Sequence, residues 1–167
     1  DGALAAVMQS GRRFEADAVA VCLGVRTNTG FLKDCGIAVN RGVLTDCHMQ
    51  TNYEGIYAAG DCCEAADIQT NAPRNIGLWH NAARQGTVAG SNMAGDVREF
   101  GANLLVNLGH YLGYSFVSMG DLTACRPEDE VLISEDSRLY LCAVRGGGAI
   151  KCINVIGTPE CSGAIKN

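Results

Sequence analysis

The sequence has 167 residues, of which 47% are hydrophobic and 19% are charged, a composition that excludes a disordered chain and allows one or two small globular domains. The net charge of −5 argues against nucleic acid or an anionic membrane as the main partner. No apolar run approaches the roughly 18 residues of a membrane-spanning helix, so we expect a cytoplasmic protein without a membrane partner.

The chain opens with a predicted strand, a turn at Ser10-Gly11 and a second strand. The second strand contains a nearly continuous apolar run from Ala16 to Leu23, broken only by Asp17. Such a run is typical of a strand covered on both faces in a parallel α/β sheet. A hairpin alone could not bury it, so we expect further chain to precede this segment.

Short elements are predicted between the hairpin and the middle of the chain. Residues 29–36, TGFLKDCG, are expected to form one or two helical turns closed by glycine. Residues 42–46, GVLTD, are expected to be extended, and Ile56–Ala59 should form a short buried strand. The polar stretch at 62–75, CCEAADIQTNAPRN, is predicted to be irregular.

The strongest helical pattern runs from about Asn75 to Met93. One face of this helix carries residues at steps of four and three, namely Trp79, Ala83, Gly86, Gly90 and Met93. Because most of these side chains are small, we expect this face to pack closely against the sheet. Asn71 or Asn75 is available to cap the start of the helix.

Residues 100–167 are predicted to form a small α+β module. Residues 114–122, YSFVSMGDL, should form a strand, and 130–147 should form two strands around a turn at Asp136-Ser137. Two further segments, 103–113 and 149–157, are each predicted as either a strand or a short helix.

The nine cysteines do not show the spacing of a disulfide or metal framework. Their number is odd, no Cys-x-x-Cys occurs, and the adjacent Cys62 and Cys63 cannot easily bridge to each other. A zinc site built from these two with Cys47 and His48 lacks the usual paired spacing. We therefore expect mostly buried or half-buried thiols in a reducing cytosol, no metal site and at most an incidental disulfide.

Asp61 follows the predicted strand directly, at the position where open α/β sheets bind ligands. Gly60 allows the backbone to come close to a ligand. The carboxylate offers two acceptor oxygens to the hydroxyl groups of a ribose or a ribityl chain. The alternative is an ordinary aspartate that caps a turn at the end of a strand.

Three segments resemble, in the same order, the FAD-dependent pyridine nucleotide-disulfide oxidoreductases. The family's second flavin-binding motif is similar to TDCHMQTNYEGIYAAGD at 45–61, with matching spacing from Thr51 to Asp61. The family's return from the nucleotide domain to the FAD domain resembles residues 17–46, with Thr27 in place of a proline. The helix of the NADH:rubredoxin reductase, ferredoxin reductase and NADH oxidase branch is similar to GLWHNAARQGTVAGSNMAG at 77–95.

This resemblance implies a partial Rossmann-like FAD/NAD(P)-binding segment and assigns roles to single residues. In the family, the aspartate of the Gly-Asp pair binds the ribityl hydroxyls of FAD, a role that corresponds here to Asp61 beside Gly60. The start of the next helix points free N–H groups at the flavin, which corresponds to Leu78 and Trp79, and Gly24 lies in the matching Gly-Val-Arg turn. A helix N-terminus stabilises the negative charge of reduced flavin. For Trp79 alone, packing in the core is the alternative.

The resemblance covers about Ala16 to Gly95 with specific motifs, and it implies that much of the family's length is missing. The Gly-x-Gly-x-x-Gly motifs for FAD and NAD(P)H do not occur in the sequence, and the run Gly146–Gly148 lacks the third glycine. We expect residues 1–24 to end the NAD(P)-binding domain, 25–99 to form the last segment of the FAD-binding domain, and 100–167 to form the C-terminal α+β domain. No catalytic residue can be assigned.

The leading hypothesis is therefore the C-terminal part of an NAD(P)H-dependent FAD oxidoreductase. The parent enzyme would pass hydride from nicotinamide to flavin and electrons to a protein or small-molecule acceptor, and homodimer formation stays open. This part alone is expected to be inactive and to bind cofactor weakly or not at all. One alternative is a non-catalytic interaction or dimerisation module without cofactor. Another is a hydrolase with a cysteine nucleophile, using Cys47 with His48 or His80, but the spacing supplies no base and orienting group.

Overall fold

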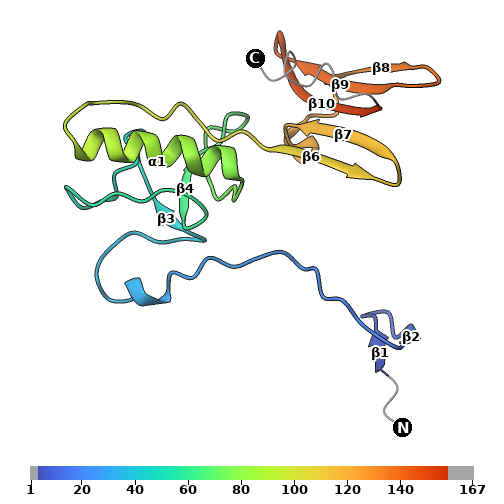
Figure 1. Cartoon of the computed structure of the whole chain (residues 1–167), viewed down its shortest axis with the longest axis horizontal. Coiled ribbons are helices and arrows are strands. Elements are labelled where there is room, and N and C mark those ends of the chain that lie inside the picture. Colours follow the sequence, from blue (N-terminus) through green and yellow to red (C-terminus); the bar gives the residue numbers. More distant parts are fainter. Residues whose placement is uncertain (1–3, 158–167) are drawn as a thin grey trace.

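The computed structural model describes residues 4–157 of the chain. Within this range the protein is α+β, with one α-helix and three separate sheets of two, three and five strands. Figure 1 shows the parts in chain order, with a small N-terminal hairpin, a central part around helix α1, and a C-terminal sheet. No helix of the described residues is long and apolar enough to cross a membrane.

The N-terminal hairpin is confirmed. Strands β1 (Leu4–Val7) and β2 (Arg13–Ala16) pair in antiparallel fashion around a turn in which Gly11 has a φ of +83°. A left-handed φ of this size suits glycine, which has no Cβ to clash with the backbone.

The predicted buried strand from Ala16 to Leu23 is wrong. Residues 17–25 form no strand, and Leu23 and Val25 are 92% and 95% exposed. In Figure 1 this stretch runs as an extended chain from the hairpin toward the central part. Among the described residues no strand lies beside it, so its backbone N–H and C=O groups have no ladder to join. An apolar run becomes a strand only when a neighbouring strand is available.

The central sheet contains three short strands. Strand β3 (Val43–Leu44) runs parallel to β4 (Cys63–Ala66), and β5 (Pro73–Arg74) is antiparallel to β4. The expected extended segment at 42–46 is thus confirmed, and the helical turn expected at 29–36 is the 3-10 helix η1 (Gly30–Leu32).

The buried strand of this part follows Asp61 instead of preceding it. Two predictions are therefore wrong: Ile56–Ala59 is extended but forms only one bridge, between Gln50 and Tyr57, and the stretch expected to be irregular contains β4. Strand β4 carries the buried Glu64, whose carboxylate accepts hydrogen bonds from the Gly42 N–H (2.6 Å) and the Asn40 amide (3.2 Å). A buried charge is tolerated when it is hydrogen-bonded in this way, and hydrophobic patterning cannot identify it.

Helix α1 (Trp79–Met93) is confirmed, although it begins four residues later than predicted. The predicted packing face is wrong, because Gly86 and Gly90 are exposed and a Cβ added to either would meet open space. The predicted cap is wrong as well. The N-cap residue is Leu78, whose side chain makes no capping hydrogen bond, and the Asn75 amide donates instead to the carbonyls of Asp61 (2.6 Å) and Cys63 (2.9 Å).

The buried face of α1 is held by side-chain amides. Asn81 donates to the Leu104 carbonyl (3.0 Å) and accepts from the Leu104 N–H (3.2 Å). Gln85 accepts from the Gly60 N–H (2.7 Å) and donates to Asn103 (2.7 Å). Each of these buried amides has partners at both ends, so the helix is anchored by a satisfied polar network.

The C-terminal sheet is antiparallel with the strand order β6-β7-β10-β9-β8. Its strands are β6 (Val106–Tyr111), β7 (Tyr114–Met119), β8 (Glu130–Glu135), β9 (Tyr140–Gly146) and β10 (Ala149–Gly157). The predicted strands are confirmed, and both ambiguous segments are strands. Between residues 100 and 157 the only helix is the 3-10 helix η2 (Leu122–Ala124), so the helical half of the predicted module is not found within that range.

Two hydrophobic clusters form the core. The central cluster contains Val43, Met49, Cys63, Ala65, Ala89 and Phe100. The cluster of the C-terminal sheet contains Val106, Val117, Met119 and Val155. The central cluster supports the segments that carry Asp61, and both clusters are small.

Candidate functional site

A cavity of about 1030 Å³ opens beside Asp61. Its walls come from the segment 25–29, from Asn40 and Arg41, from Asp61 and Cys62, and from Asn75 and Gly77. Ligand pockets of proteins usually measure about 300–1,000 Å³, so this cavity suits a large ligand.

The Asp61 carboxylate is exposed at the cavity wall, on a backbone that is fixed from two sides. The Asn75 amide donates to the Asp61 carbonyl, and the N–H of Gly60, whose φ is +88°, donates to Gln85. Among the described residues the carboxylate has no hydrogen-bond partner. Both of its oxygens are therefore available to accept hydrogen bonds from a ligand.

Gly77 lies directly against this carboxylate. A Cβ added at Gly77 would stand 3.1 Å from the Asp61 Cγ, which is closer than ordinary van der Waals contact. The absence of a side chain at this position thus leaves room for the carboxylate at the cavity wall.

Two arginines, Arg26 and Arg41, line the same cavity. The Thr27 hydroxyl donates to the Arg41 carbonyl, which connects the two wall segments. A proline at position 27 could not make this contact, because it has no hydroxyl group. The cavity wall therefore contains a carboxylate that can accept from hydroxyls and two residues whose side chains carry positive charge, a type that suits phosphate groups.

The structure brings only some of the predicted site residues together. Gly60 and Asp61 are adjacent at the cavity, and Gly24, with a φ of +82°, directly precedes the cavity residue Val25. Leu78 and Trp79 follow Gly77 but are not part of the cavity wall.

Within the described residues Trp79 does not pack into a core, since its side chain is 87% exposed. The first turn of α1 contains no acidic residue, and no described side chain caps it.

Sequence reasoning missed Arg41, Asn75 and Gly77. Arg26 could have been identified from the sequence, because it belongs to the Gly-Val-Arg turn that resembles the family. The other three are brought to Asp61 only by the tertiary fold.

The cysteines differ in exposure. All eight described cysteines are free, and Cys62 is exposed at the cavity, whereas its neighbour Cys63 is buried. Burial, together with a smaller contribution from the nearby Cys62, raises the pKa of Cys63 to about 12. Cys63 is thus a neutral thiol at physiological pH and not a nucleophile.

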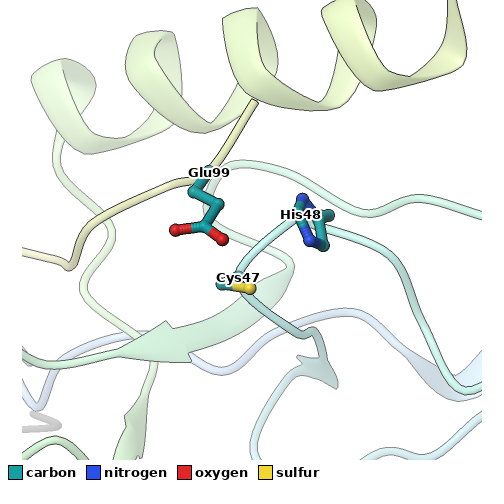
Figure 2. A group of neighbouring side chains, drawn as sticks. All are labelled: Cys47, His48 and Glu99. Atoms are coloured by element: carbon teal, nitrogen blue, oxygen red, sulfur yellow. The ribbon is translucent and has the colours of Figure 1, made fainter. Parts of the chain in front are cut away.

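The hydrolase alternative gains no support at His80, whose Nε2 lies 3.1 Å from the Leu104 carbonyl. Cys47 and His48 do lie close to a third group, Glu99, as Figure 2 shows. The ring of His48 contacts the Arg98 carbonyl through Nδ1 (3.0 Å), so a backbone group orients this histidine.

Comparison with known proteins gives consistent matches. Residues 1–86 match the family model described as "Pyridine nucleotide-disulphide oxidoreductase". The NADH-rubredoxin oxidoreductase of Clostridium acetobutylicum is 29% identical over 137 residues, which are 82% of this chain and 35% of that protein. An NADH oxidase of Methanocaldococcus jannaschii is 35% identical over 96 residues, which are 57% of this chain and 21% of that protein.

A solved structure matches over most of the described chain. The crystal structure of NADH:rubredoxin oxidoreductase from Clostridium acetobutylicum aligns with a TM-score of 0.66 and 31% identity, and covers 87% of this chain and 36% of that chain. The chain therefore spans about a third or less of the length of these relatives.

Proposed function

Because the chain belongs to the pyridine nucleotide-disulphide oxidoreductase family, we propose that it is the C-terminal part of an NAD(P)H-dependent FAD oxidoreductase. When bound, the flavin would supply the chemistry, accepting hydride from nicotinamide and passing electrons to an acceptor. The names of the relatives, an NADH-rubredoxin oxidoreductase and an NADH oxidase, support this reaction class.

The cavity at Asp61 is the observation that carries this proposal. Its carboxylate is exposed, free of protein partners among the described residues, and has room because Gly77 lacks a side chain. These features fit a polyol such as the ribityl chain of FAD. Arg26 and Arg41 would attract the negative phosphates of the same cofactor.

The start of α1 supports a second contact. The N–H groups of the first turn lie at the positive end of the helix dipole, which favours negative charge. We therefore retain Leu78 and Trp79 as the backbone positions that would face the flavin ring. Gly24 would let the chain turn toward the cavity, because its positive φ is readily adopted only by glycine.

The domain division is part of the same proposal. The strands of the hairpin lie within residues 1–24, β3 to β5 and α1 lie within 25–99, and β6 to β10 lie within 100–167. Because each sheet lies wholly within one of these ranges, the distribution supports the proposed domain boundaries after residues 24 and 99. A cytoplasmic location, assembly as a homodimer, and a protein or small molecule as electron acceptor complete the proposal, and light scattering would test the assembly.

Flavin binding tests this function. We expect the longer parent protein to bind FAD in stoichiometric amount and to bleach its visible absorbance when NADH or NADPH is added. The 167-residue chain should bind FAD weakly or not at all, because the sequence has no Gly-x-Gly-x-x-Gly turn for the pyrophosphate. A parent protein that is purified without bound flavin and does not bind added FAD would favour an interaction module instead.

A further inference from the structure

Three side chains of metal-binding type meet outside the cavity at Asp61. A sulfur of Cys47, a ring nitrogen of His48 and a carboxylate oxygen of Glu99 lie within 4.8 Å of one another. Figure 2 shows Glu99 reaching from the segment after α1 toward the loop that carries Cys47 and His48. Ligand atoms of a tetrahedral zinc site lie about 3.3–3.8 Å apart. Small side-chain rotations would close this difference, since Cys47 and Glu99 are exposed.

We propose that Cys47, His48 and Glu99 form a Zn²⁺ site. Thiolate sulfur, imidazole nitrogen and carboxylate oxygen are the three ligand types that zinc binds in proteins. A thiolate and an imidazole do not suit Mg²⁺ or Ca²⁺, which prefer oxygen ligands. Three protein ligands leave a fourth position for water, and binding releases the proton of the Cys47 thiol to solvent.

A hydrogen bond to the backbone fixes the tautomer of His48 in a form that can bind a metal. Its Nδ1 lies 3.0 Å from the Arg98 carbonyl, an acceptor, so in this contact Nδ1 carries the hydrogen. The lone pair is then on Nε2, which is left to bind a metal. Histidines that bind zinc regularly donate a hydrogen bond to a carbonyl from the ring nitrogen that does not bind the metal.

The loop of Cys47 and His48 is held by Asp46. One carboxylate oxygen of Asp46 accepts from the N–H groups of His48 (2.8 Å) and Gln50 (2.9 Å). Met49, between these two residues, is fully buried in the central core with a φ of +62°. The loop thus has a defined conformation without metal.

The segment of Glu99 is tied to the same loop. The Asn92 amide donates to the carbonyls of His48 and Arg98 (2.9 Å each), and its oxygen accepts from the Arg98 N–H. The Phe100 N–H donates to the Cys47 carbonyl (2.7 Å). Ligands that lie 51 residues apart in sequence are therefore brought together before a metal binds, which lowers the entropic cost of binding.

Sequence spacing predicts no such site, because Glu99 comes from a distant segment. Zinc would join the loop after β3 to the segment after α1, and its main effect would be to stabilise the central part. The proposal does not depend on flavin binding, because no residue of the trio belongs to the cavity wall. A failure of the zinc titration would therefore leave the proposed flavin binding intact, and a failure of the FAD titration would leave the proposed zinc site intact.

Metal titration of the full chain tests the proposal. After treatment with a chelator, we expect the protein to bind one equivalent of Zn²⁺ and to unfold at a higher temperature with zinc present. Co²⁺, used as a spectroscopic substitute, should give a thiolate-to-cobalt charge-transfer band in the near ultraviolet. A protein that binds no zinc, or a cobalt complex without this band, would overturn the site.

Ligand variants define the site further. Cys47→Ser, His48→Gln and Glu99→Gln should each weaken zinc binding by at least about tenfold, and Cys47→Ser should abolish the cobalt band. The matched controls Cys35→Ser and Glu54→Gln change exposed residues outside the trio. They should leave the zinc affinity and the cobalt band unchanged. A band that survives Cys47→Ser but disappears in Cys35→Ser would assign the metal to other thiols. Rapid alkylation of Cys47 without any zinc uptake would indicate a nucleophilic cysteine instead.

Discussion

Asp61 is a side chain that is exposed and yet fixed in position. Its backbone is held through the Asn75 amide and, at the preceding residue, through the bond from Gly60 to Gln85. The carboxylate itself makes no hydrogen bond to the described residues. This combination suits a ligand contact better than a turn cap, since a capping aspartate would accept from nearby backbone N–H groups.

Substitution of Asp61 should lower the affinity of the parent protein for FAD. Hydrogen bonds to charged groups contribute about 1.5–3 kcal/mol, so Asp61→Ala should weaken binding by roughly one to two orders of magnitude. FAD titration, followed by flavin fluorescence, measures this effect. The exposed Asp17→Ala serves as the control and should bind FAD like the wild type. Equal affinity in Asp61→Ala and the wild type would return Asp61 to the role of a turn residue.

Adjacent cysteines should differ sharply in reactivity. Cys62 is exposed, whereas burial raises the pKa of Cys63 to about 12. In the native protein at pH 8, a thiol reagent should therefore modify Cys62 and leave Cys63 intact until the protein unfolds. Labelling of the single variants Cys62→Ser and Cys63→Ser, followed by mass spectrometry, distinguishes the two sites.

The same pKa has a consequence for stability at high pH. The folded state holds the Cys63 proton more tightly than the unfolded state, whose pKa is near 9.0. The stability linked to this thiol is complete below pH 9 and falls as the pH rises toward 12, by at most about 1.4 kcal/mol per pH unit. Cys63→Ala should lack this part of the pH dependence in urea unfolding between pH 8 and 10.5.

At the scale of elements, helix α1 shows that a correct helix can be assigned the wrong face. The small residues at steps of four and three face solvent, and the polar residues Asn81 and Gln85 face the core. The glycines on the solvent side make the helix less stable than alanines would, because glycine is about 1 kcal/mol less favourable than alanine in a helix interior.

Gly86→Ala and Gly90→Ala should therefore each stabilise the protein, by up to about 1 kcal/mol. Both positions have helical φ values and open space at the Cβ. Chemical denaturation measures the change. As a contrast, Gly60→Ala should be destabilising, since its φ is +88°. A loss of stability in both helix variants would show that the glycine face is packed against another surface.

Local signals were sufficient for α1, the hairpin and the C-terminal strands, because propensity, periodicity and turn residues agree there. They failed at β4, where the buried Glu64 has its partners in a distant loop. They also failed at residues 17–23, where an apolar run has no neighbouring strand. At the site, Gly60 and Asp61 were found from a contiguous motif, whereas Arg41 and Gly77 were not, because the cavity gathers them from separate segments.

At the scale of the whole molecule, a polar junction connects the central part to the C-terminal sheet. Gln69 accepts from the Asp121 N–H (2.6 Å) and donates to the Lys151 carbonyl (3.1 Å). Arg74 forms ion pairs with Asp121 (2.6 Å) and with the buried Asp67 (3.3 Å). No shared hydrophobic cluster of the described residues spans this junction, so its stability depends on these hydrogen bonds and ion pairs.

The junction should therefore weaken in acid. Hydrogen bonds from Thr123 and the ion pair with Arg74 lower the pKa of Asp121 below its ordinary value of 3.8. The linked stability is present above pH 3.8 and is lost as the pH falls through the folded pKa. The Asp121→Asn variant should have a lower free energy of unfolding in urea at pH 7 than the wild type. Between pH 7 and pH 3 this free energy should change less in the variant than in the wild type. The exposed Asp17→Asn should keep the wild-type profile, and identical profiles for Asp121→Asn and wild type would contradict this account.

The uncovered stretch 18–25 has a consequence for the behaviour of the chain in concentrated solution. It is extended, contains no charge and no proline, and makes no backbone hydrogen bond to the described residues. Segments of this composition readily pair with copies of themselves, and such pairing templates the growth of cross-β aggregates. The colloidal stability of the chain therefore depends on these eight residues, which contribute to neither core. A partner that covers them would act as a solubiliser as well as a binding surface.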